Sequence, residues 1–128
     1  MFENSVLVVA HPDDDILCLS SVVDKVDKIV FCFNDYPAIP GLGIARKKTI
    51  DEYPLSNVFS LDITEPQSFD KANWEEPVIT EYGIKLSKCR ESEARYTETY
   101  EILLHRISGL VADRANVYTH NPWGEYGH

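Results

Sequence analysis

The chain has 128 residues, of which 44% are hydrophobic and 26% charged, a composition typical of one globular domain. Its net charge of −9 argues against binding to nucleic-acid phosphates or to an anionic membrane surface. The apolar run near the N-terminus is too short for a signal peptide or a membrane span, so we expect neither a nucleic-acid nor a membrane partner.

The first third of the chain predicts a strand, a helix and a second strand. Short continuous apolar runs predict strands over Ser5–Ala10 and Lys28–Phe33 that are buried on both faces, and the periodic pattern over Asp14–Val26 predicts a helix between them. This spacing indicates parallel strands joined by a right-handed crossover. Cys18 and Cys32 fall in these apolar runs, which predicts buried thiols and favours a reducing, cytoplasmic setting.

The rest of the chain continues the alternation of helices and strands. In order, we expect a Pro/Gly-rich loop over 34–43, a helix over Ile44–Glu52, a strand over Val58–Asp62, a polar loop over Thr64–Pro77, a helix over Ser92–Ala112 and a strand over Asn116–Thr119. The helix over Ser92–Ala112 has the clearest pattern, because its apolar residues recur at intervals of three and four. The sequence therefore predicts an α/β fold, with a Rossmann-like, mostly parallel sheet flanked by helices in a single domain over residues 1–128.

A histidine and three aspartates, His11-Pro12-Asp13-Asp14-Asp15, lie where the first strand passes into the first helix. One interpretation is a helix cap made of aspartates, beside an incidental histidine. The other is a metal site, in which His11 and Asp14 face one ion and Asp13 takes a proton from a water molecule. Ligands bind at the carboxyl ends of strands in open α/β sheets, so this position suits a metal-assisted hydrolase.

A second polar segment, Thr119-His-Asn-Pro-Trp-Gly-Glu-Tyr-Gly-His128, follows the last predicted strand. A parallel sheet would bring this segment to the same edge as His11, and His120 is its first residue after the strand. The alternative is a cluster of Gly/Pro turns at the end of the chain.

The two segments AHPDDD and THNPWGEYGH together resemble the LmbE-like, or PIG-L, N-acetylglucosaminyl deacetylase family. The resemblance covers Val6 to His128 and corresponds to the N-terminal part of a typical member. It implies a zinc-dependent deacetylase acting on an N-acetylated sugar or glycoconjugate. His11 and Asp14 match the first two zinc ligands, and Asp13 matches the general base.

The resemblance implies roles for three more residues. His128 matches a histidine that stabilises or protonates the tetrahedral intermediate, and Tyr126 matches a tyrosine that polarises the acetyl carbonyl. Arg46 matches an arginine near the substrate, although a solvated helix residue is the alternative. Separately, Trp123 on the same edge offers an aromatic face for a sugar ring, with ordinary packing as the alternative.

The chain departs from the family pattern at two places. Asp15 stands where the family has glutamate, and the third zinc ligand, a histidine three residues beyond His128, is absent. We therefore expect an N-terminal portion of a longer enzyme, and so an incomplete domain. The alternatives are hydrolysis of another acyl or amide group by the same site, or a non-catalytic metal- or sugar-binding module with the same fold.

Overall fold

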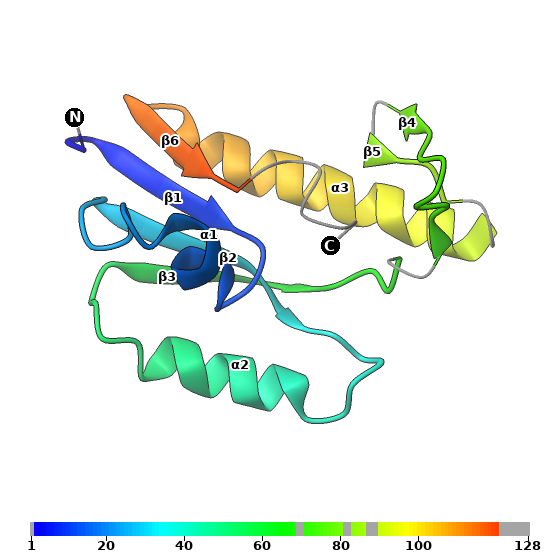
Figure 1. The fold of residues 1–128 in the computed structure, drawn as a ribbon, viewed down its shortest axis with the longest axis horizontal. Coiled ribbons are helices and arrows are strands. Elements are labelled where there is room, and N and C mark those ends of the chain that lie inside the picture. Colours follow the sequence, from blue (N-terminus) through cyan, green and yellow to red (C-terminus); the bar gives the residue numbers. More distant parts are fainter. Residues whose placement is uncertain (1, 69–70, 81–82, 87–89, 121–128) are drawn as a thin grey trace.

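A computed structural model describes residues 2–68, 71–80, 83–86 and 90–120 (Figure 1). A four-stranded sheet has the strand order β3-β2-β1-β6, and all of its neighbouring strands are parallel. The mostly parallel α/β fold is thereby confirmed. The elements in chain order are β1 (Ser5–Val9), α1 (Asp14–Leu19), β2 (Lys28–Asp35), α2 (Leu42–Asp51), β3 (Val58–Thr64), β4 (Ile79–Thr80), β5 (Gly83–Ile84), α3 (Arg90–Val111) and β6 (Asn116–Thr119).

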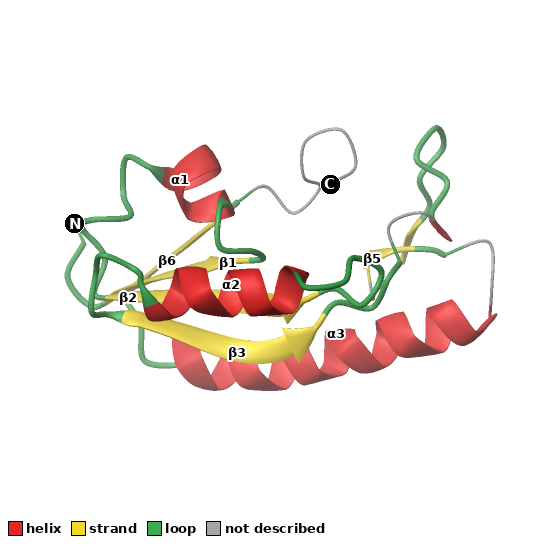
Figure 2. Cartoon of the chain, turned by 90° about the horizontal axis from the view of Figure 1, so that it is seen from below, coloured by secondary structure: helices red, strands yellow, loops and turns green. Residues whose placement is uncertain are grey.

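Helices cover both faces of the sheet, with α1 and α2 on one face and α3 on the other (Figure 2). Side chains along β1 alternate between these layers. Val6 and Val8 belong to the core beneath α3, whereas Leu7 and Val9 belong to the core beneath α1 and α2. Because helices cover both faces, all five residues of β1 are buried, which explains the continuous apolar run over residues 6–9.

The first helix is shorter than its apolar pattern predicts. It ends at Leu19, and the prediction that it continues to Val26 is wrong. Turns follow instead, in which the backbone N–H of Val22 bonds to the carbonyl of Leu19. Two serines come directly after Leu19, and serine side chains compete for backbone hydrogen bonds, which disfavours further helix. Val23 and Val26 are nevertheless buried in the core, so their spacing reports burial and not helix.

The other predicted elements are confirmed with small changes of length. Strands β2 and β3 each run two residues farther than expected, to Asp35 and Thr64. The short antiparallel pair β4–β5 was not predicted. Cys32 is buried as expected, but the prediction for Cys18 is wrong, since this thiol is exposed on α1. No helix in the described ranges is long and apolar enough to cross a membrane.

The path of the chain through the sheet creates a switch point beside β1. From β1 the chain moves through β2 to the edge strand β3, and later returns to β6 on the opposite side of β1 (Figure 1). The connection that leaves β1, through α1, packs on one face of the sheet, whereas α3, which leads into β6, packs on the other face. Ligands in open α/β sheets bind at the carboxyl ends of such strands. The segment that leaves β1 at this edge begins with Ala10 and His11.

Candidate metal centre

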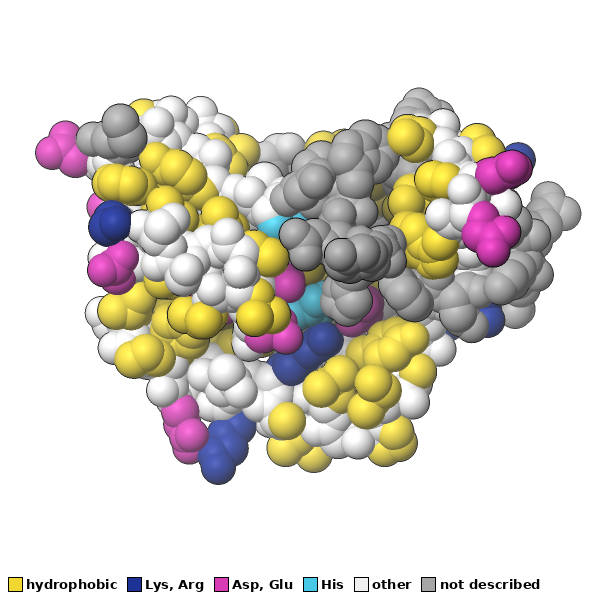
Figure 3. Space-filling model, viewed as in Figure 1, with side chains coloured by type: hydrophobic (Ala, Val, Ile, Leu, Met, Phe, Trp, Pro, Cys, Tyr) yellow, Lys and Arg dark blue, Asp and Glu magenta, His cyan; other side chains and the backbone are white. Residues whose placement is uncertain are grey.

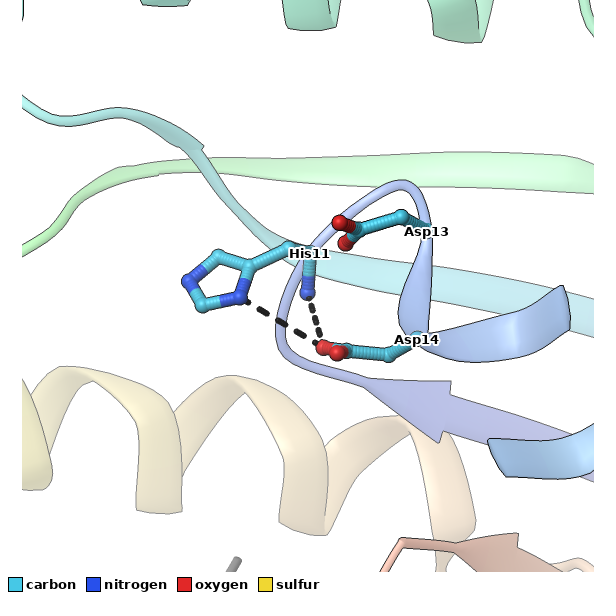
Figure 4. A group of neighbouring side chains, drawn as sticks. All are labelled: His11, Asp13 and Asp14. Atoms are coloured by element: carbon cyan, nitrogen blue, oxygen red, sulfur yellow. Dashed lines mark hydrogen bonds and ion pairs between the residues drawn. The ribbon is translucent and has the colours of Figure 1, made fainter. Parts of the chain in front are cut away.

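The turn after β1 folds the chain back on His11. The backbone N–H groups of Asp13 and Asp14 both donate to the carbonyl of His11, at 2.9 and 3.3 Å. The Asp14 carboxylate in turn accepts a hydrogen bond of 2.8 Å from the backbone N–H of His11. Asp14 Oδ2 thereby comes to lie 3.5 Å from His11 Nδ1 (Figure 4). A local turn, closed by its own hydrogen bonds, thus fixes the histidine and the aspartate side by side.

Asp13 occupies the N-cap position of α1 but its side chain makes no capping hydrogen bond. The interpretation of the aspartates as a simple helix cap therefore does not account for Asp13. Its carboxylate is exposed and lies beside the other two side chains (Figure 4). Ligand atoms of His11, Asp13 and Asp14 all lie within 4.8 Å of one another. This group can hold a metal ion, and imidazole nitrogen with carboxylate oxygen is a donor set that suits zinc and other divalent cations.

The opposite side of the His11 ring contacts a residue that the sequence analysis missed. His11 Nε2 lies 3.2 Å from Glu65 Oε2, and the same oxygen accepts a hydrogen bond of 3.2 Å from Arg46 Nη1. Glu65 is the first residue after β3, and Arg46 lies on α2. The position of Glu65 directly after a strand could have indicated a site residue. The predicted strand ended at Asp62, however, so Glu65 fell inside a predicted loop.

Carboxylates on both sides determine the charge of His11. Burial lowers the pKa of the ring, but hydrogen bonds to Asp14 and Glu65 outweigh burial and raise the pKa to about 9. For the carboxyl groups of Asp14 and Glu65, burial acts to raise the pKa. Interactions that include the hydrogen bond to His11 outweigh burial, so the pKa of each carboxyl is lowered. In the absence of a metal, His11 is therefore an imidazolium at neutral pH. Figure 3 shows histidine, acidic and basic side chains gathered in the middle of this face.

His120 comes to the same edge from β6. Its Nε2 accepts a hydrogen bond of 3.3 Å from the backbone N–H of Ala10, directly before His11. An electrostatic interaction with His120 is also among the causes that lower the pKa of Asp14. The prediction that the end of the last strand lies near the first motif is thereby confirmed for His120.

The remaining predicted site residues have separate outcomes. Arg46 lies at the site with a side chain only 17% exposed, so the alternative of a solvated helix residue is wrong. Asp15 is fully buried and its carboxylate accepts a hydrogen bond from the Tyr53 hydroxyl, between α1 and the segment after α2. Three predicted residues lie outside the described residues: Trp123, Tyr126 and His128.

Comparison of the chain with protein-family models, with curated proteins and with solved structures gives no match. The likeness to the LmbE-like family therefore stays a prediction drawn from two sequence segments. What the structure adds is a mixed nitrogen and oxygen donor set, held on one turn at the switch point of a parallel sheet.

Proposed function

We propose that the protein is a zinc-dependent N-deacetylase that removes acetate from an N-acetyl amino sugar or its conjugate in the cytoplasm. The observation that carries the proposal is the grouping of His11, Asp13 and Asp14 within 4.8 Å at the carboxyl end of β1. Histidine with carboxylates is a ligand set of hydrolytic metal enzymes. The sequence resemblance supplies the reaction class and the substrate class.

The proposed reaction uses three residues of the turn after β1 and two residues of the C-terminal segment. His11 and Asp14 hold the cation, which when bound polarises the acetyl oxygen and lowers the pKa of a water molecule. Asp13 takes a proton from this water while the water oxygen forms a bond to the acetyl carbon. The carbon–nitrogen bond then breaks, acetate leaves, and Asp13 or His128 passes a proton to the amine. Tyr126 and His128 are proposed to stabilise the negative charge on the acetyl oxygen.

Because Asp13 is exposed and makes no capping bond, it suits a base that meets both water and substrate. Arg46 and Trp123 are proposed to contact the sugar. Arg46 is held in place by its hydrogen bond to Glu65, and a guanidinium has further N–H donors that suit a substrate hydroxyl.

Zinc titration of the metal-stripped protein by calorimetry tests the proposal, together with an assay of acetate release from N-acetylated amino sugars. We expect binding at one site that His11→Ala abolishes. The isosteric Asp13→Asn variant should keep its zinc and lose about 100-fold or more in turnover. If Asp13→Asn lost zinc as fully as Asp14→Asn, Asp13 would be a ligand and not the base.

The same experiment separates the alternatives. Tight zinc binding with no hydrolysis of any acylated sugar in a panel would favour a non-catalytic binding module. Faster hydrolysis of other acyl groups than of acetyl would support the proposed site but assign it a different substrate.

A further inference from the structure

We infer that Glu65 is a positioning residue for the metal site: it holds His11 Nε2–H, so that Nδ1 faces Asp13 and Asp14. The inference rests on the proposed metal site and adds a residue that neither sequence motif contains. Glu65 reaches the ring from the end of the edge strand β3, 54 residues farther along the chain.

The geometry of imidazole allows only one of its nitrogens to face a given ion, because the two nitrogens point away from each other. Nδ1 lies 3.5 Å from Asp14 Oδ2, on the side of the ring where the carboxylates of the turn gather (Figure 4). Nε2 lies 3.2 Å from Glu65 Oε2 on the other side. One ring nitrogen therefore faces the proposed ion, and the other faces a hydrogen-bond acceptor.

The distribution of charge decides which side takes the cation. Glu65 is already paired with the Arg46 guanidinium, whose charge opposes a second cation at the same oxygen. Within the described residues, neither Asp13 nor Asp14 has a Lys or Arg partner. A divalent cation is therefore attracted more strongly to the Nδ1 side, and Glu65 is left to accept the proton of Nε2.

Glu65 is itself fixed in place, which a positioning residue requires. Its backbone N–H donates to the Asp35 carbonyl at 2.9 Å, and Arg46 holds its carboxylate. The ring of Phe33 packs against His11 with 5.9 Å between centroids, which further restricts rotation of the imidazole. Carboxylates placed behind a histidine ligand in this way typically contribute about 10- to 100-fold to metal affinity.

Zinc affinity of Glu65→Gln tests the inference, with Glu52→Gln as the matched control because Glu52 is exposed at the end of α2. We expect Glu65→Gln to bind zinc about 10- to 100-fold more weakly and Glu52→Gln to bind it like the wild type. Thermal unfolding of the metal-free variants shows whether they fold. As a second readout, ¹⁵N NMR of the zinc-loaded wild type should show His11 with a proton on Nε2 and zinc on Nδ1.

Two results would overturn the role of Glu65 while leaving the metal site standing. One is equal zinc affinity in the wild type and Glu65→Gln. The other is zinc on Nε2, which would make Glu65 a direct ligand. A wild-type protein that binds no zinc at all would instead refute the proposed function, and this inference with it. If Glu65→Gln does not fold, the NMR measurement on the wild type decides.

Discussion

The stability of the metal-free protein should fall as the pH rises through the range in which His11 loses its proton. The pKa of His11 rises from 6.5 to about 9 on folding, and His11 is only 8% exposed. A group whose pKa is higher in the folded state makes its full contribution to stability at pH values below its pKa in the unfolded state. The contribution decreases as the pH rises from that pKa to the pKa of the folded state, and it is absent above it. Here the two values correspond to about 3 kcal/mol, present below pH 6.5 and lost by about pH 9.

Urea unfolding between pH 6 and pH 10 in the presence of EDTA measures this effect. His11→Asn supplies the reference, because the difference between the two unfolding free energies isolates the titration of one ring. We expect the advantage of the wild type to shrink by about 1.4 kcal/mol per pH unit midway through the range. A difference that stays constant from pH 6 to pH 10 would refute the assignment of an imidazolium between two carboxylates.

Three further outcomes follow from the structure. Zinc binding at pH 7 should release about one proton, because His11 must lose it, and a binding enthalpy independent of the buffer would contradict this. Gly43→Ala should lower the free energy of unfolding by about 1–3 kcal/mol, since its Cβ would lie 2.5 Å from Asp35 Oδ1, whereas Gly109→Ala in α3 has open space and should stabilise. Leu7→Ala in β1 should cost about 2–5 kcal/mol in urea unfolding, and a cost under about 1 kcal/mol would contradict its complete burial.

Burial on both faces is the reason that the strands could be predicted from the sequence. A central strand such as β1 has no solvated side, so its apolar residues run without interruption and are easily recognised. The end of α1 could not be predicted in the same way. Val23 and Val26 are buried although they lie after the helix, in a segment of turns. The spacing of apolar residues indicates which residues are buried, but it does not determine whether the backbone there is a helix or a turn.

In the candidate site, too, some residues could be predicted from the sequence and one could not. His11, Asp13 and Asp14 are neighbours in sequence, and one tight turn is enough to group them. Glu65 depends on strand order and register, because β3 must lie on the correct side of β2 and extend to Thr64 before Glu65 can reach the ring. Contacts of this kind arise from the assembled sheet. The sequence can at most place Glu65 after a strand, and it does not show which side chain Glu65 reaches.

The hydrogen bond between His11 and Glu65 also joins two strands that are not neighbours. It leads from the interior strand β1 over the end of β2 to the edge strand β3. Edge strands ordinarily open more readily than the centre of a sheet, and an opening of β3 would break this bond. Any ligand that orders the His11 ring therefore also opposes local opening of β3, and slower amide exchange over Val58–Thr64 would report its occupancy. The outermost strand would thus respond to an ion that it never touches.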